Sequence, residues 1–191
     1  MSRLFYSLIF AILSFPAAAG ENILTPMIGI TSWSDDTGHI GRGTALNFSD
    51  STQTTLGFRY LYLFDNGVAV GGDFYLYDKD IELGQANDAG VLHTHALVEY
   101  FFNPKSDIMP FIGLGIGISA IGFDGGNMDG DGTGGSSYEL NGGVLFRLTD
   151  VIGVQVEYKY TDFNMDEDID GFNTKIDTSA NTLLLGLTIH I

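Results

Sequence analysis

Apolar and polar residues alternate with a period of two along most of the chain, a pattern typical of β-strands rather than of helices. Eight stretches carry this alternation, and each is near or above the length of about 9–11 residues with which a tilted strand crosses a bilayer. The predicted strands are Ile23–Trp33, Gln53–Phe64, Val68–Lys79, Val91–Phe102, Ile108–Gly122, Ser136–Leu148, Val151–Phe163 and Ser179–Ile191.

The connections between these strands alternate in length. The tight ones are Asp65–Gly67, Asn103–Asp107 and Thr149–Asp150, and the long ones are Ser34–Thr52, Asp80–Gly90, Phe123–Gly135 and Asn164–Thr178. Asn66-Gly67 supplies the positive φ angles that a hairpin turn requires. Short turns at one rim and long loops at the other are typical of membrane barrels. We therefore predict an all-β fold, a closed eight-stranded antiparallel transmembrane β-barrel with up-and-down meander topology and both termini at the short-turn rim.

The two faces of the predicted strands differ in composition. Isoleucine and leucine occupy one face of the fifth strand, while Gly113, Gly115 and Gly117 share the other. An eight-stranded barrel is just wide enough to be filled by side chains, so long inward side chains need small neighbours. A soluble barrel of the lipocalin kind is the alternative, but its polar face would be the wet exterior, where a row of glycines has no steric role. The pattern therefore favours a membrane barrel with a polar interior.

Charged residues on the interior face nearly balance, as buried charges require. These predicted lumen charges are Arg59, Asp73, Glu99, Glu139, Arg147, Glu157 and Lys159. A three-residue turn at Asp65–Gly67 places Arg59 directly opposite Asp73, as a cross-strand ion pair. Aromatic residues near the strand ends are expected to form interfacial girdles. They are Tyr60, Tyr62, Phe64, Tyr100, Phe102, Tyr158 and Phe163.

The first residues have the order of a secretory signal. Arg3 precedes an apolar run of about 12 residues, and Ala17-Ala18-Ala19 follows as a cleavage site. A membrane anchor is the alternative, but the run is shorter than the roughly 20 residues that a spanning helix needs. We expect a signal peptide at residues 1–19 and the barrel domain at residues 20–191.

Charge and cysteine content exclude several functions. Eight Lys and Arg residues face 24 Asp and Glu residues, a formal net charge of −16, so nucleic-acid binding is not expected. Without cysteine there is no disulfide, no thiolate nucleophile and no cysteine-bound zinc. The long loops and adjacent strand ends carry sixteen acidic residues against Arg42, Lys79 and Lys175. This acidic rim would repel lipopolysaccharide phosphates unless divalent cations bridge the two. A solvated surface suited to a saline habitat is the alternative interpretation.

The segment from Pro110 to Ser119, the Asp65-Asn66-Gly67 turn and the apolar alternation before Ile191 resemble the small outer-membrane β-barrels of the OmpA, OmpX and OmpW kind. The resemblance covers the chain after the signal and implies the outer membrane of a Gram-negative bacterium. Such proteins usually end in Phe, whereas this chain ends in Ile191. The resemblance implies no single activity, because the same architecture hosts adhesins, anchors, conduits for small apolar molecules and lipid-modifying enzymes.

One loop has the spacing of a calcium site. Asp166, Asp168, Asp170 and Asp177 occupy positions 1, 3, 5 and 12, with Gly171 at position 6. Aspartate replaces the usual bidentate glutamate at position 12, so we expect weak binding. Asp129–Gly134 is a poorer version of the same pattern. Acidic loops of this composition also occur without an ion, so both interpretations are open.

Catalytic chemistry has weaker support. His93 and His95 share a strand face near Glu99, a spacing compatible with a metal or with acid–base work. Packed lumen filling is the alternative. Barrel acyl-transfer enzymes need a serine nucleophile with a histidine base, and Ser119 shares the interior face, but no His-x-Ser stretch occurs. We therefore predict no catalytic residues and no cofactor other than calcium in the outer loops.

The leading hypothesis is a non-enzymatic outer-membrane barrel whose acidic loops act in envelope stabilisation, adhesion or cation-mediated surface contact. A narrow OmpW-like conduit for small hydrophobic molecules is the second hypothesis, and a lipid A-modifying enzyme is the third. The expected partners are outer-membrane lipid and lipopolysaccharide, with a monomeric barrel and an unidentified surface ligand.

Overall fold

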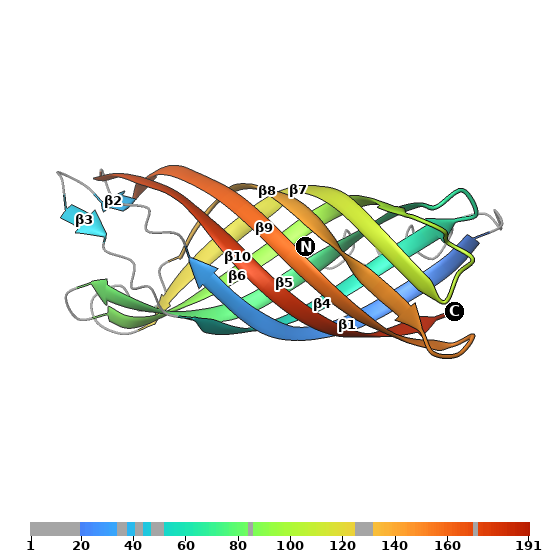
Figure 1. Cartoon of the computed structure of the whole chain (residues 1–191). Helices are drawn as coiled ribbons and strands as arrows, with labels where there is room; N and C mark the ends of the chain where they lie inside the picture. The colour runs from blue at the N-terminus through green and yellow to red at the C-terminus, as the bar shows by residue number, and fades with distance from the viewer. Residues whose placement is uncertain are drawn as a thin grey trace, which may run out of the picture.

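The computed structural model describes residues 20–33, 38–40, 44–46, 52–83, 86–124, 132–169 and 172–191. It does not describe the side chains of residues 38–40, 44–46, 78–89, 121, 123–133 and 165–177. Within this part of the chain eight long antiparallel strands each pair with the next, and the first also pairs with the last (Figure 1). The long strands are β1 (Gly20–Trp33), β4 (Gln53–Phe64), β5 (Val68–Leu83), β6 (Ala86–Phe101), β7 (Ile108–Asp124), β8 (Gly132–Arg147), β9 (Ile152–Ile169) and β10 (Phe172–His190). The predicted closed eight-stranded meander is confirmed. The described residues contain no helix with the length and apolar content needed to cross a membrane.

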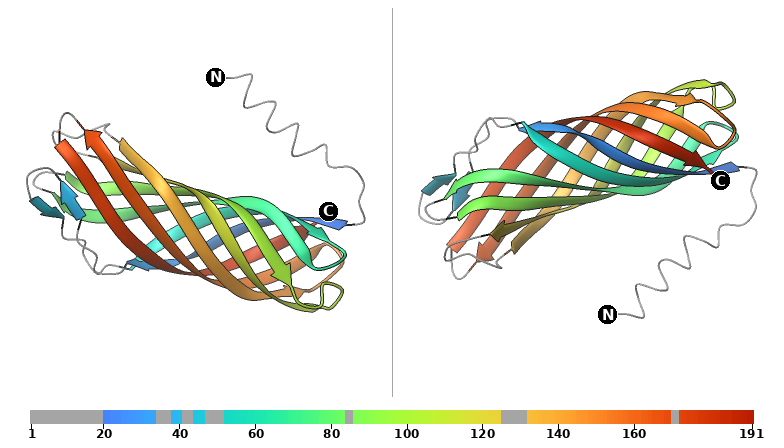
Figure 2. Two further views of the ribbon diagram at one scale, coloured as in Figure 1. Left: turned by 90° about the horizontal axis from the view of Figure 1, so that it is seen from above. Right: turned by 90° about the horizontal axis from the view of Figure 1, so that it is seen from below.

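The described chain begins and ends at the same end of the barrel (Figure 2). Asn22 and Ile191 exchange both backbone hydrogen bonds there, at 3.0 and 2.9 Å. The tight connections 65–67, 102–107 and 148–151 lie at this end too, which we call the turn end, and the opposite end is the loop end. Gly67 has a φ of 87°, and its N–H donates to the Phe64 carbonyl at 3.0 Å, so the predicted turn is present. The positive φ predicted for Asn66 is wrong.

The strands at the loop end are longer than predicted. β5 and β6 continue to Leu83 and from Ala86, and β9 and β10 continue to Ile169 and from Phe172. The predicted loops Asp80–Gly90 and Asn164–Thr178 are therefore wrong in extent, and part of Phe123–Gly135 is strand as well. Main-chain pairing needs only N–H and C=O groups, so Asp, Asn and Thr side chains do not end a ladder that is already in register.

Part of the predicted first long loop also joins the sheet. The short strands β2 (Gly38–Ile40) and β3 (Thr44–Leu46) pair with each other, and β2 pairs with β10 through Ile40 and Thr174. The sheet therefore continues past β10 at the loop end through β2 and β3.

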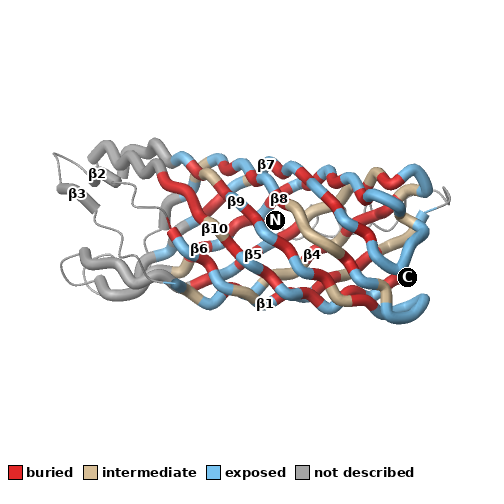
Figure 3. Tube along the Cα trace, viewed as in Figure 1, coloured by how far each residue is buried: buried red, intermediate tan, exposed pale blue. Residues whose placement is uncertain are grey.

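Buried and exposed residues alternate along most of the described parts of the long strands (Figure 3), except that Leu61, Tyr62 and Leu63 of β4 are buried in succession. On β7 Leu114, Ile116 and Ile118 are 64%, 65% and 67% exposed, while Phe111 and Ser119 on the other face are buried. The exposed face is the apolar one, which is the arrangement that hydrocarbon surroundings favour and water does not. The interior glycines have the steric role expected of them. A Cβ on Gly115 would lie 2.5 Å from Glu139 Cγ and 2.7 Å from Leu97 Cδ2.

Candidate functional site

The lumen is the part of the described chain where polar chemistry is concentrated, and three layers of side chains fill it. The layer nearest the turn end is apolar. Phe101 and Phe111 stack with their ring centroids 5.0 Å apart, and Met109 and Leu145 beside them are completely buried. The remaining members of this layer are Ile23, Leu61, Leu63, Ala69 and Leu97. Buried polar side chains lie at this level too, since Gln155 pairs with Leu145 and His190 pairs with Ile23.

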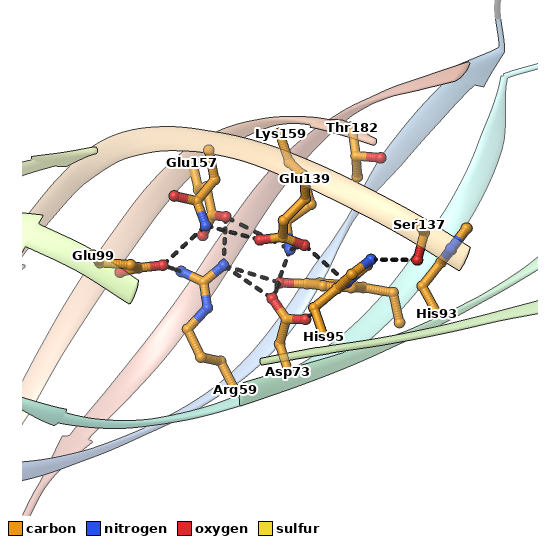
Figure 4. A network of polar contacts seen from close by, with 12 residues as sticks. Arg59, Asp73, His93, His95, Glu99, Ser137, Glu139, Glu157, Lys159 and Thr182 are labelled. Atoms are coloured by element: carbon orange, nitrogen blue, oxygen red, sulfur yellow. Dashed lines mark hydrogen bonds and ion pairs between the residues drawn. The ribbon is translucent and has the colours of Figure 1, made fainter. Parts of the chain in front are cut away.

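The middle layer is an ion network centred on Arg59 and Lys159 (Figure 4). Arg59 on β4 reaches across the lumen to Glu157 on β9 at 2.5 Å, and it contacts Glu99 on β6 at 3.0 Å. Its contact with Asp73 on β5, directly opposite in register, is longer, at 3.4 Å. The Lys159 ammonium donates to Asp73 and Glu139 at 2.7 Å each. The network therefore ties together β4, β5, β6, β8 and β9.

Neutral side chains complete the middle layer. Tyr75 donates to Asp73 at 2.9 Å, and the Lys159 Nζ lies 3.6 Å from the centroid of the Tyr75 ring. The Asn141 amide donates to Glu99 and Glu139, at 2.9 Å each. Buried carboxylates need such donors, since leaving one of them unpaired costs several kcal/mol (about 3–5).

Carboxylates outnumber fixed cations in this layer. Arg59 and Lys159 face four buried acids, which are Asp73, Glu99, Glu139 and Glu157. His95 lies between two of these acids, with its Nδ1 at 3.3 Å from Asp73 and 3.0 Å from Glu139. Each cation thus serves more than one carboxylate, so losing a cation should cost more than losing an acid.

An aromatic layer lies nearest the loop end. Trp33 packs edge to face on Tyr77 and on Phe163, at centroid distances of 5.4 and 5.5 Å. His93 packs against Phe163 at 5.5 Å and bonds to the Tyr77 hydroxyl through Nε2. Threonines fill the space beside this layer, with the Thr31 hydroxyl 2.5 Å from that of Thr55. These side chains come from β1, β4, β5, β6 and β9, so the lumen is filled at this level as well.

Six of the seven predicted lumen charges meet in the middle layer. Arg147 is not among them, although it shares a face of β8 with Glu139 and Asn141. It lies near the turn end of β8, its side chain is 22% exposed, and it donates to Glu21 at 2.6 Å. His190 bonds to the other oxygen of Glu21 at 2.9 Å. Parity along a strand predicts the face of a residue, but not how far from the barrel mouth it lies.

Two residues of the predicted girdle are not exposed. Phe163 faces the lumen and is completely buried, since it shares the odd-numbered face of β9 with Glu157 and Lys159. Tyr62 is buried too, with its ring 4.9 Å from that of Phe64. Asn141 and Tyr75 also belong to the network. Their positions in the alternation place them inside, but the sequence does not predict their contacts.

Histidine and serine side chains form two arrangements with the contacts of a nucleophile and its base. Ser137 lies 2.9 Å from His95 Nε2, and His95 Nδ1 contacts Glu139 (Figure 4). Ser119 contacts the Nδ1 of His93. All of these side chains are almost completely buried. A substrate carbonyl cannot approach either serine, so packing and hydrogen bonding account for both arrangements.

Asp73, His95 and Glu139 also place their ligand atoms within 4.8 Å of one another, close enough to surround a metal ion. The Lys159 ammonium already contacts both carboxylates. A metal ion would therefore have to displace a bound cation, so this group does not fit a resident metal.

The four predicted calcium ligands, Asp166, Asp168, Asp170 and Asp177, lie outside the described side chains. The backbone pairs Asp166 with Lys175 and Asp177 with Asn164. Calcium binding by these residues stays a prediction.

The comparisons with known proteins agree with this architecture. The profile of the outer membrane protein beta-barrel domain family matches residues 5–190, and the chain belongs to this family. No curated protein sequence matches the chain. The protein is therefore an outer-membrane β-barrel of the Gram-negative type.

Solved structures with the same fold are distant in sequence. Neisserial surface protein A has a TM-score of 0.64 and 12% identity, covering 88% of this chain and 96% of that one. OprG from Pseudomonas aeruginosa has a TM-score of 0.63 and 16% identity, covering 91% and 97%. Ail of Yersinia pestis, solved with the heparin analogue sucrose octasulfate, has a TM-score of 0.54 and 17% identity, covering 90% and 99%. At this level of identity the likeness shows the fold alone.

Proposed function

We propose that this protein is a monomeric, non-enzymatic outer-membrane barrel that holds an acidic surface outside the cell and contacts lipopolysaccharide through bridging divalent cations. Its signal peptide, residues 1–19, directs it out of the cytoplasm, and its turn end with both termini faces the periplasm. Adhesion and envelope stabilisation are consequences of the same surface contact.

The observation that carries the proposal is the filled lumen. A conduit needs a continuous path, yet the aromatic layer, the ion network and the apolar layer follow one another between the two ends of the described barrel. Charged groups buried in mutual contact are costly to pull apart (about 3–5 kcal/mol per broken pair), so the middle layer is not a mobile gate. This supports a role outside the lumen.

The charge at the loop end supports contact through cations. The sixteen acidic residues of these segments and three basic ones leave a local charge of −13. Phosphates and carboxylates repel each other in the absence of a bridging ion, and divalent cations bind oxygen ligands of both kinds. A sulfated sugar such as the sucrose octasulfate bound to Ail would be repelled by this surface.

Burial of the candidate nucleophiles supports the absence of catalysis. Ser119 and Ser137 are each 1% exposed, and neither reaches the lipid face, where a lipid substrate would lie. A lipid-modifying enzyme needs a nucleophile and a base at that face.

The first test is conductance of the purified barrel in planar bilayers, with folded insertion confirmed by faster migration of the unheated sample on a detergent gel. We expect no discrete conductance steps and no uptake of small apolar molecules into vesicles. Reproducible steps or saturable uptake would support the conduit instead.

The second test measures attachment of barrel-containing vesicles to a lipopolysaccharide layer with and without millimolar calcium. Wild type should attach only with calcium, and a variant with Asp166, Glu167, Asp168 and Asp170 replaced by amides should attach more weakly. A matched control replaces Asp65 and Asp107 at the turn end, and it should behave as wild type. Calcium-independent attachment, or equal attachment of all three proteins, would contradict the proposed contact.

A further inference from the structure

Glu99 differs from the other three acids of the ion network, because one of its carboxyl oxygens has no donor. Its Oε1 atom lies 3.0 Å from Arg59 Nη1 and accepts a hydrogen bond from the Asn141 amide at 2.9 Å. Its Oε2 atom is buried, and no described residue donates to it. Both oxygens of each of the other three acids accept a hydrogen bond. Glu99 therefore lacks the full set of donors that stabilises an ionised carboxylate.

The Asn141 side chain beside Glu99 also has an atom without a partner. Its amide nitrogen donates to Glu99 and Glu139, but its Oδ1 atom is buried, and no described residue donates to it. Glu99 on β6 and Asn141 on β8 are both directly opposite Gly113 of β7. A Cβ on Gly113 would lie 2.5 Å from Glu99 Cγ and would also collide with Asn141 Oδ1. The two side chains thus meet over the bare glycine.

A single proton on Glu99 Oε2 supplies the donor that both atoms lack. A neutral carboxyl group has one O–H donor. Beside an amide it forms two parallel hydrogen bonds, in which the amide N–H donates to one carboxyl oxygen and the carboxyl O–H donates to the amide oxygen. The first of these bonds is present at 2.9 Å, and the second would satisfy both unpartnered atoms. Buried polar groups are rarely left without a partner.

The charges of the middle layer favour the same proton. Arg59 and Lys159 carry the two fixed positive charges, and a protonated His95, whose Nδ1 contacts two of the acids, would bring the number to three. Four ionised acids would still leave one negative charge in excess. A buried charge without a counter-charge costs several kcal/mol (about 3–5), and a proton on one acid removes the excess.

The surroundings of Glu99 explain why the proton lies on this acid. Its neighbours in the ladder, Ala69 on β5 and Gly113 on β7, carry no charge. Arg59 on β4 is its one cationic contact among the described residues, and this guanidinium lies closer to Glu157 on β9, at 2.5 Å. The remaining charged groups that face it across the lumen are Asp73 of β5, His95 of β6, Glu139 of β8 and Lys159 of β9.

We propose that Glu99 holds a buried proton in the folded barrel at neutral pH, in a carboxyl–amide pair with Asn141, and that this proton makes the stability of the barrel depend on pH. An exposed glutamate in the unfolded chain is ionised at pH 7, so folding takes up one proton at this site. The unfolded state then binds fewer protons than the folded state, and stability falls as the pH rises. Mildly acidic surroundings therefore stabilise the filled lumen.

The test compares Glu99→Gln with the wild-type barrel, because the amide has the shape and the neutral charge of the protonated acid. Glu157→Gln is the matched control, since it makes the same change in an acid whose two oxygens both have donors. In urea unfolding at pH 7 we expect Glu99→Gln to have a midpoint equal to or higher than that of wild type, and Glu157→Gln a lower one. Between about pH 5 and 7 the unfolding equilibrium constant of wild type should rise with pH more steeply than that of Glu99→Gln, by up to about tenfold per pH unit.

Infrared spectroscopy of the folded protein at pH 7 observes the proton directly. Wild type should show the carbonyl band of a buried carboxylic acid, shifted in D₂O, and Glu99→Gln should lack it. Absence of the band from wild type, or its persistence in Glu99→Gln, would overturn the proposal. A urea midpoint of Glu99→Gln below that of wild type, or equal pH dependence of the two proteins, would also overturn it and would assign an ionised Glu99 with a bound water molecule. These results do not depend on conductance or on calcium-dependent attachment, so this inference and the proposed function can fail separately.

Discussion

Replacing Arg59 by methionine should destabilise the barrel more than replacing any one acid of the ion network. Arg59 contacts Glu157 at 2.5 Å, Glu99 at 3.0 Å and Asp73 at 3.4 Å, and all of these side chains are completely buried. Without the guanidinium, four buried carboxylates depend on Lys159 alone for a fixed positive charge. Removing one partner from a buried ion pair costs about 3–5 kcal/mol, and we expect a loss in this range.

Glu157→Gln should cost less, about 1–2 kcal/mol. The substitution removes a hydrogen bond to a charged group but also lowers the excess of acids over cations. The double variant should cost less than the sum of the single variants, with a coupling energy of about 1–3 kcal/mol. Lys105→Met, at an exposed turn position, is the matched control and should change stability by about 0.5 kcal/mol or less.

Urea unfolding in lipid vesicles measures these differences through Trp33. The chain has one tryptophan, and its ring packs between Tyr77 and Phe163 in the lumen, so its fluorescence reports loss of the interior. Equal costs for Arg59→Met and Glu157→Gln would refute the argument from charge excess. A cost for Arg59→Met no larger than that of Lys105→Met would show that the network is hydrated.

Three further results are expected. Phe111→Ala should lower the free energy of unfolding by about 3–5 kcal/mol, because the ring stacks on Phe101 in the apolar layer. An unchanged urea midpoint would show that this layer is loosely packed. Gly115→Val should prevent folding or yield a barrel without the gel-mobility shift, because even a Cβ at this position would lie 2.5 Å from Glu139 Cγ. Gly122→Val is the control and should fold normally, because a Cβ at that position would have no atom within 4 Å. Calorimetry should detect calcium binding at roughly 10⁻⁴–10⁻³ M that is lost on changing both Asp168 and Asp170 to Asn, and equal uptake by the two proteins would reduce this segment to a merely acidic one.

The sequence predicts the register of neighbouring strands well where a short turn joins them. The three-residue turn at Asp65–Gly67 places Arg59 opposite Asp73, and the structure has this pair. The shortest contact of Arg59, however, is with Glu157, 98 residues away on the other side of the lumen. Contacts across a barrel depend on strand tilt and on side-chain rotamers, neither of which follows from local alternation.

Whether a residue faces the lumen follows better from its odd or even position along the strand than from its residue type. The aromatic ring of Phe163 and its place near a strand end predict an exposed girdle position, but its odd position on β9 places it inside with Glu157. The composition after Asp80 predicts a loop, but β5 pairs with β6 as far as Leu83, with a change of register between Asp80 and Leu83. For Arg147, parity indicated the interior, but only the three-dimensional structure shows that it reaches the turn end and meets Glu21.

Access of water to the middle of the lumen tests the filled barrel most directly. The chain has no cysteine, and Ser137 contacts His95 in the middle layer, so Ser137→Cys introduces a single thiol there with little change in volume. In lipid vesicles a water-soluble maleimide should leave this thiol unmodified while it labels Ser106→Cys in the exposed turn, and both should react once the protein is unfolded. Labelling of folded Ser137→Cys at a rate close to that of Ser106→Cys would show an open lumen and contradict the account.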